Sequence, residues 1–166
     1  MSYQSFEQVL QKCHTEEKEF WQVILEDDMA ERNVSLQESM EHMRATWDAM
    51  LLAAATYEGN LNSSSGLVGG DGRRMEEYIP SDIREKYHIA GALQMGESNA
   101  CMKRIVAAPT AGACGVLPAV LVPYFQKRCR NTDKILKAMY VAAGIGQIIA
   151  TRSSISGAAG GCQAEI

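Results

Sequence analysis

The sequence lacks a long apolar run, a signal-peptide pattern and closely spaced cysteine pairs. No stretch of its 166 residues is long and apolar enough to span a bilayer, and its first residues are polar and acidic where a signal peptide needs a basic start. Five cysteines, an odd number without a C-x-x-C pair, do not describe a disulfide framework. We therefore expect a cytoplasmic protein with reduced thiols and no membrane association.

Clusters of basic residues are also scarce. Lys127, Arg128 and Arg130 form the only cluster of three basic residues, so the sequence does not indicate a nucleic-acid surface. We interpret these three residues as the end of a helix, where cations complement the helix dipole. Residues 1–50 carry eleven acidic and four basic side chains within a net charge of −4, which is typical of a solvated helical surface.

The composition is that of one ordinary globular domain. Hydrophobic residues make up 46% and charged residues 22% of the chain. A chain of this length can bury roughly two-thirds of its unfolded surface, enough for one core without disulfides. Because strand-like alternation, repeats and a linker are absent, we predict an all-α fold, with residues 1–166 forming a single helical domain.

Apolar residues at helical spacing predict the individual helices. Ser35-x-x-Glu38 is a capping box before a long apolar stripe, and Asn131 to Asp133 would cap a buried helix. Pro118 suits a first helical turn. The expected helices are two short ones or one bent one within residues 6–25, one from Leu36 that ends before Gly59, one from about Pro80 toward Met102, one at 116–124 and one at 135–150.

Three loops rich in Gly, Ser and Thr separate these helices, at 58–74, 106–115 and 153–161. Their exposed N–H groups and hydroxyls could hold a carboxylate or a phosphate, or the loops could be simple tight connections. The first loop is not a P-loop, because Gly66-x-x-Gly69 lacks the following Gly-Lys-Ser/Thr, and no strand precedes it as in a Rossmann turn.

Two cysteines, Cys114 and Cys162, lie inside glycine-containing loops. Neighbouring glycines let backbone amides approach a thiolate, so a redox or metal role is open. The absence of closely spaced ligand pairs argues against a metal role on spacing alone. The other three, Cys13, Cys101 and Cys129, have helical surroundings typical of packed thiols.

Three runs together resemble the alpha chain of the bacterial iron–sulfur-dependent L-serine dehydratases: SSSGLVGGDGRRM, SNACMKRIVAAPTAGACGVLPAVLVPY and SSISGAAGGCQAEI. The resemblance extends roughly from Leu61 to Ile166. It implies a mostly helical catalytic domain whose 4Fe-4S cluster is held by three cysteines, with one iron open for substrate. It assigns Cys114, in A-P-T-x-G-x-C-G, and Cys162, in G-C-Q-A-E, as ligands. The third ligand is expected beyond residue 166, in a longer alpha chain, and the shorter chain alone is expected to be inactive.

The resemblance also implies the reaction and the partners. L-Serine would lose water and then ammonia to give pyruvate, and a beta chain would complete an oligomeric enzyme. The general base is not identified, because His14, His42 and His88 lie outside the matching motifs. Our candidates for holding the substrate carboxylate and amine are Ser63, Ser64, Ser65, Gly66 and Thr110, with Asp71 on the amine.

Two other classes of protein are alternative interpretations of this sequence. A pyridoxal-phosphate lyase could perform the same reaction, but it needs a Schiff-base lysine beside a phosphate loop in an α/β fold, which neither Lys103 nor Lys134 offers. A non-enzymatic helical interaction module would account for the acidic first part of the chain. It would leave the three glycine-rich loops unexplained.

Overall fold

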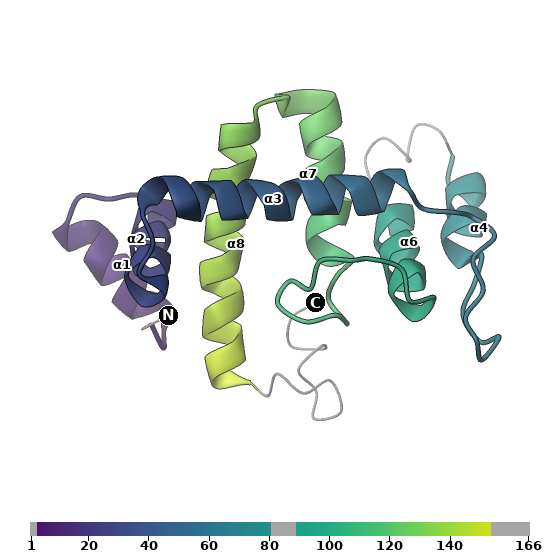
Figure 1. Cartoon of the computed structure of the whole chain (residues 1–166), viewed down its shortest axis with the longest axis horizontal. Coiled ribbons are helices and arrows are strands. Elements are labelled where there is room, and N and C mark those ends of the chain that lie inside the picture. The colour runs from purple at the N-terminus through teal and green to yellow at the C-terminus, as the bar shows by residue number, and fades with distance from the viewer. Residues whose placement is uncertain (1–2, 81–88, 154–166) are drawn as a thin grey trace. The chain divides into compact units, whose positions relative to one another are not determined.

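The computed structural model describes residues 3–80 and 89–153, and every regular element within these ranges is a helix (Figure 1). The predicted all-α fold is confirmed. None of the described helices combines the length and apolarity that a membrane span requires. The elements are α1 (Phe6–Thr15), α2 (Phe20–Arg32), α3 (Leu36–Ala55), α4 (Asp71–Tyr78), α6 (Ile89–Ala100), α7 (Val116–Tyr124), the π-helix η1 (Phe125–Cys129) and α8 (Thr132–Arg152).

The chain divides into two compact units. The first contains the described residues up to Trp47 and those from Asn131 onward, and the second contains Asp48–Arg130. Helix α3 contributes its beginning to the first unit and its end to the second.

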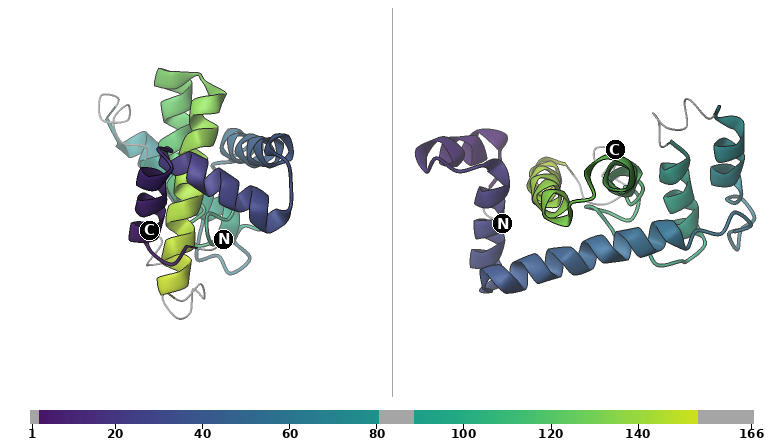
Figure 2. Two further views of the ribbon diagram at one scale, coloured as in Figure 1. Left: turned by 90° about the vertical axis from the view of Figure 1, so that its left-hand side faces the viewer. Right: turned by 90° about the horizontal axis from the view of Figure 1, so that it is seen from above.

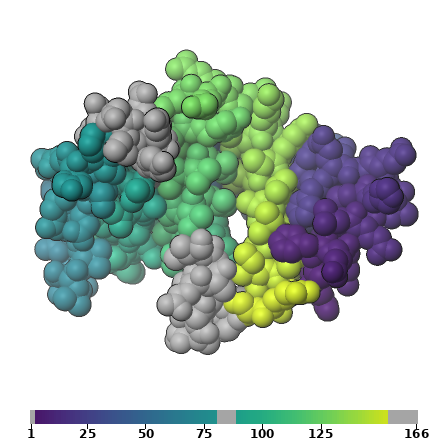
Figure 3. Space-filling model, turned by 180° about the vertical axis from the view of Figure 1, so that it is seen from behind, coloured from purple at the N-terminus to yellow at the C-terminus, as the bar shows by residue number. Residues whose placement is uncertain are grey.

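The first unit is built where α2 packs against α8 and α1 packs against α2 (Figures 2 and 3). Its core is an apolar cluster that includes one tyrosine. The buried residues of this core are Val9, Val23, Ile24, Leu25, Tyr140 and Ile148. Burial of these side chains supplies the main stabilisation of the unit, at about 1.5–3 kcal/mol for each large aliphatic side chain.

A buried hydroxyl pair joins three helices of this unit. Ser39 on α3, 1% exposed, donates from Oγ to Oδ2 of Asp28 on α2 at 2.6 Å. The same Oγ lies 2.6 Å from the hydroxyl of Tyr140 on α8. Because serine has one hydroxyl proton, Tyr140 donates and Ser39 accepts. Burial raises the pKa of Tyr140, which keeps that donor protonated.

Several helix boundaries match the prediction. The capping box is present, since the Ser35 N–H donates to Glu38 Oε2 at 2.8 Å and the Glu38 N–H donates to Ser35 Oγ at 3.3 Å. The Asn131 side chain accepts from the Lys134 N–H at 3.1 Å and caps α8. The first apolar stretch forms two helices, α1 and α2, rather than one bent helix.

Helix α4 is the main difference from the prediction. It begins at Asp71, inside the stretch 58–74 that we predicted to be loop throughout, so the prediction is wrong for 71–74. Most of the predicted helix start at Pro80 to Asp82 and most of the loop at 153–161 lie outside the described residues, and the described Pro80 is not helical. Helix α6 covers the later part of the predicted helix and ends at Ala100.

The second unit contains the predicted site residues that the structure describes. Helix α4 packs against α6, and α6 packs against α7. Its small core consists of Ala53 from α3, Met95 from α6 and Cys114, with Tyr57 and Ile105 packed around it. The first two of the three loops that could bind a ligand, at 58–74 and 106–115, therefore belong to this one unit.

Gly144 is required for the contact between α8 and α2. A Cβ at this position would lie 2.6 Å from Cδ1 and Cγ1 of Ile24, a side chain that is itself 1% exposed. We expect Gly144→Ala to lower the free energy of unfolding by about 1–3 kcal/mol, because overpacking outweighs the gain in helix propensity. The matched control is Gly96→Ala on α6, where a Cβ would meet nothing within 4 Å. Gly96→Ala should raise the free energy of unfolding by about 0.5–1 kcal/mol. Urea titration of both variants and the wild-type chain measures the two effects.

Candidate functional site

The Ser/Gly-rich loop before α4 is built by its own polar groups. The Ser63 N–H donates to the Val68 carbonyl at 2.8 Å, and the Val68 N–H donates to Ser63 Oγ at 3.1 Å. The Gly66 N–H donates to the Ser63 carbonyl at 2.9 Å, and the φ of +72° at Gly66 favours glycine there. Ser63 Oγ lies 3.1 Å from Ser65 Oγ. These contacts make a tight turn from Ser63 to Val68.

Ser64 differs from the two serines beside it. Its side chain is exposed, and it makes no hydrogen bond to the other described residues. The Ser63 and Ser65 oxygens contact each other and accept backbone N–H groups of the turn, which leaves one of their two hydroxyl protons uncommitted. Of the three predicted serines, Ser64 is the one that makes no hydrogen bond among the described residues.

The end of this loop is held by a buried carboxylate. Glu97 on α6 is 3% exposed. Its Oε1 accepts from the backbone N–H of Asp71 and, at 3.1 Å, from that of Gly72. Its Oε2 accepts from the Tyr57 hydroxyl at 2.5 Å. Glu97 thus binds the first two N–H groups of α4, which no residue within the helix can satisfy.

A guanidinium holds the same segment by its carbonyl groups. Arg74 donates from Nη2 to the Gly69 carbonyl at 3.1 Å and from Nε to the Gly70 carbonyl at 3.2 Å. Its Nη2 also lies 2.8 Å from Oδ1 of Asp71. The predicted amine-binding carboxylate of Asp71 is therefore already paired with a cation.

Cys114 is buried next to α6. It is 1% exposed, and its thiol donates to the Met95 carbonyl at 3.6 Å. Burial raises the pKa of this thiol. Cys114 stands directly before Gly115, the N-cap of α7. A Cβ on Gly115 would lie 2.6 Å from the Ala92 carbonyl oxygen, so glycine is what allows this turn to approach α6.

Thr110 lies in the loop that leads to Cys114 and shapes it through the backbone. Its carbonyl accepts from the N–H groups of Ala108 at 3.3 Å and Ala113 at 3.2 Å. Asn99 on α6 donates from Nδ2 to the Ala111 carbonyl at 3.0 Å. The loop is therefore attached to α6 on the side of its last turn.

Helix α6 contacts three segments that carry or adjoin predicted site residues. Met95 contacts Cys114, Glu97 binds the start of α4, and Asn99 binds the loop of Thr110. Tyr57 packs against the core around Cys114 and also reaches Glu97. Cys162 and His88 lie outside the described residues, and His14 and His42 are exposed in the first unit.

Sequence reasoning missed Glu97 and Tyr57. The available signal was that Glu97 is the one charged residue in the twelve residues of α6, IAGALQMGESNA. A lone carboxylate in an otherwise apolar and small-residue helix indicates a buried partner, because burial of an unpaired carboxylate is costly. The partners of Glu97 could not be predicted from the sequence, because Asp71 is 26 positions away from it.

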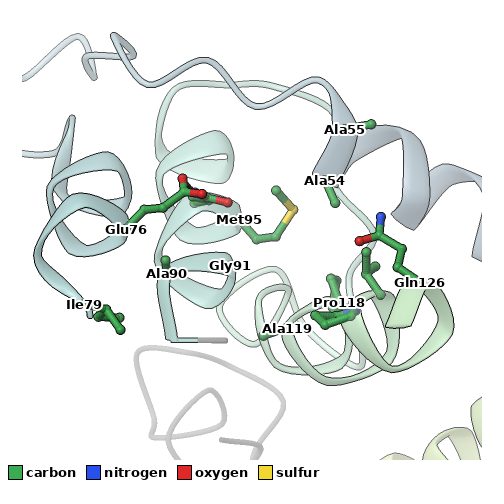
Figure 4. Close-up of a pocket in the computed structure, with 13 residues that line it drawn as sticks. Ala54, Ala55, Glu76, Ile79, Ala90, Gly91, Met95, Pro118, Ala119 and Gln126 are labelled. Atoms are coloured by element: carbon green, nitrogen blue, oxygen red, sulfur yellow. Dashed lines mark hydrogen bonds between the residues drawn. The ribbon is translucent and has the colours of Figure 1, made fainter. Parts of the chain in front are cut away.

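A pocket of about 250 Å³ lies between the end of α3, α4, α6 and α7 (Figure 4). Met95 lies between Ala54 and Ala119 there, and the polar side chains of Glu76 and Gln126 stand at its sides. None of the residues predicted to bind substrate lines this pocket. Its lining combines small and apolar side chains with the polar Glu76, Gln94 and Gln126.

Of the two predicted metal ligands, Cys114 lies among the described residues and Cys162 lies outside them. Among residues 3–80 and 89–153, no three His, Cys, Asp or Glu side chains come together as a metal site requires. Cys114 directly precedes the N-terminus of α7, where negative charge is favoured, whereas burial raises the pKa of its thiol and so disfavours the thiolate that a metal would bind.

Comparison of the sequence with known proteins identifies the family of the chain. A sequence model of the family described as "Serine dehydratase alpha chain" matches residues 15–166. The probable L-serine dehydratase alpha chain of Bacillus subtilis is 31% identical over 157 residues, which are 87% of this chain and 52% of that protein. The L-serine dehydratase alpha chain of Peptoniphilus asaccharolyticus is 31% identical over 168 residues, 95% of this chain and 56% of its own length.

A shorter match has higher identity. L-serine dehydratase 2 of Escherichia coli is 46% identical over 77 residues, 45% of this chain and 17% of that protein. The chain spans about half the length of the two curated alpha chains that it matches. No solved structure matches the chain significantly.

The close approach at Gly115 gives a test of the geometry around Cys114. We expect Gly115→Ala to lower the free energy of unfolding by about 1–3 kcal/mol, because the added Cβ meets backbone atoms of Ala92 that cannot turn away. Gly91→Ala is the matched control at the same helix pair, since its Cβ would lie 3.8 Å from Ala119 Cα. Equal effects of the two substitutions in thermal unfolding would contradict the described packing.

Proposed function

Because the chain belongs to the serine dehydratase alpha chain family, we propose that it acts as part of an L-serine dehydratase, which converts L-serine to pyruvate and ammonia. The observation that carries the proposal is the family match over residues 15–166, together with two alpha chains that are 31% identical. The two units would be parts of one helical catalytic domain. A non-enzymatic interaction module is not favoured, because it does not account for this match.

The proposed cofactor is a 4Fe-4S cluster. Cys114 would supply one thiolate and Cys162 another, and a third cysteine is expected outside these 166 residues. The support for Cys114 is its position before α7, with its side chain buried against Ala53 and Met95. When bound, such a cluster supplies a Lewis acid that stabilises the hydroxyl oxygen leaving from serine.

The chain's own contribution to substrate binding would come from the loop Ser63–Gly66 and from Thr110. Hydroxyl and backbone N–H donors suit a carboxylate. The hydroxyl of Ser64 is our first candidate among them, because this side chain is exposed. Asp71 could meet the substrate ammonium only by sharing its carboxylate with Arg74. We assign no general base in this chain, and the beta chain would provide it.

The remaining partners follow from the family. The alpha chain would assemble with a beta chain into an oligomer, and L-serine would be the substrate. Among the described residues, Cys13, Cys101, Cys114 and Cys129 form no disulfide with one another. This state is consistent with a reducing compartment, so we place the enzyme in the cytoplasm.

Loss of one ligand tests the cofactor assignment. The full-length alpha chain with its beta chain is reconstituted anaerobically with iron and sulfide, and visible absorbance and bound iron are measured. Cys114→Ala should lose most of both, because a cluster that keeps one ligand fewer is not retained. Cys101→Ala is the control, since Cys101 is half-buried and close to the same loop. Retention of a full cluster in Cys114→Ala would contradict the assignment.

Removal of one loop hydroxyl tests the substrate site. In the reconstituted complex, Ser64→Ala should raise KM for L-serine about tenfold, because a hydrogen bond to a charged group contributes about 1.5–3 kcal/mol. The control is Asn60→Ala, an exposed polar side chain in the same loop. An unchanged KM for Ser64→Ala would remove Ser64 from the site.

A further inference from the structure

The one charged residue of α6 is deeply buried and fully engaged. Glu97 is 3% exposed, and its carboxylate accepts hydrogen bonds from two backbone N–H groups and one phenol. Burying a carboxylate without partners costs several kcal/mol, so these three donors are what make its burial possible. We therefore ask what the three hydrogen bonds of Glu97 position.

The two N–H groups belong to the first residues of α4. The residue before them, Gly70, has a φ of +76° and no side chain that could cap the helix. Glu97 takes the place of a local cap, and its negative charge also lies at the positive end of the α4 dipole. The start of α4 is therefore determined by a residue on another helix.

The Ser/Gly-rich loop is tied to that start. Arg74 in the first turn of α4 holds the carbonyls of Gly69 and Gly70. A Cβ on Gly69 would lie 2.3 Å from the Leu61 carbonyl oxygen, so the two ends of the loop are in close backbone contact. Ser63 and Val68 pair inside this closure. A shift of the α4 start would consequently move the turn that carries Ser64.

Tyr57 connects the same carboxylate to Cys114. Its hydroxyl donates to Glu97 Oε2 at 2.5 Å, while its ring packs against the core of Ala53, Met95 and Cys114. Burial and the Glu97 carboxylate raise the pKa of Tyr57 to about 12, which keeps the phenol a donor at neutral pH. One carboxylate thus joins the serine turn to the surroundings of the proposed ligand.

We propose that Glu97 is a positioning residue for substrate binding, which sets the place of the serine turn relative to Cys114 through the α4 N-terminus and Tyr57. This inference rests on the proposed function of the turn. Glu97 does not act on the substrate itself, because its two oxygens are occupied by protein donors and its side chain is 3% exposed.

The kinetic test uses the full-length alpha chain with its beta chain, reconstituted anaerobically. Glu97→Ala should raise KM for L-serine about tenfold or more, with kcat per bound cluster changed less than about threefold. Glu97→Gln should lie between wild type and Glu97→Ala, because its amide oxygen can still accept from Asp71 and Gly72. The control is Glu77→Gln on α4, whose exposed carboxylate pairs with Arg73 at 2.8 Å.

A direct readout is hydrogen exchange of the backbone amides of Asp71 and Gly72. Exchange at these amides should be faster in Glu97→Ala and unchanged in Glu77→Gln. Tyr57→Phe leaves these two hydrogen bonds in place and should change KM by only about two- to fivefold. If Glu97→Ala does not fold, Glu97→Gln and Tyr57→Phe carry the test.

The outcomes separate the two proposals. If wild-type complex deaminates L-serine and the Glu97 variants keep its KM, the positioning role is overturned and the proposed function stands. A purely structural role would lower the amount of cluster-loaded enzyme without a change in KM, which also overturns the inference. If the wild-type complex does not deaminate L-serine at all, the proposed function falls, and the substrate role of Glu97 falls with it.

Discussion

The second unit depends on a buried carboxylate that accepts the N–H groups at the start of a neighbouring helix. Glu97 satisfies two donors of α4 that have no partner within the helix, and α4 satisfies an acceptor that could not otherwise be buried. The requirement is mutual, so neither element reaches its place without the other. The serine turn before α4 and the Tyr57 ring beside Cys114 are positioned as a consequence.

Close backbone approach to α6 is the second constraint. Gly72 and Gly115 both lie against this helix, where a Cβ would meet Gln94 at 2.7 Å or Ala92 at 2.6 Å. Absence of a side chain at these two positions lets α4 and the turn before α7 lie close to one helix. In the proposed dehydratase, the serine turn and a cluster ligand are thereby carried by the same rigid support.

Local signals predicted much of this arrangement. The capping box at Ser35, the cap at Asn131 and the apolar periodicity placed α3, α8 and the two first helices, because these features act within about four residues. The glycine-rich loops and Cys114 were also identified, as was the family. Helix α4 was not predicted, since its N-terminal cap comes from Glu97, 26 positions away from Asp71. The pairing of Asp71 with Arg74 was also not anticipated.

The amino-acid sequence by itself determined the all-α class, the helix caps, the family and the residue types that could bind L-serine or a cluster. It did so because periodicity, capping and motif identity are local properties. Only the tertiary structure decided which of the three serines makes no hydrogen bond among the described residues, which cation pairs with Asp71, and that Cys114 is buried beside Met95. These features depend on contacts that do not follow from the local sequence pattern. The hydrogen bonds of the buried Glu97 with Asp71, Gly72 and Tyr57 are such contacts.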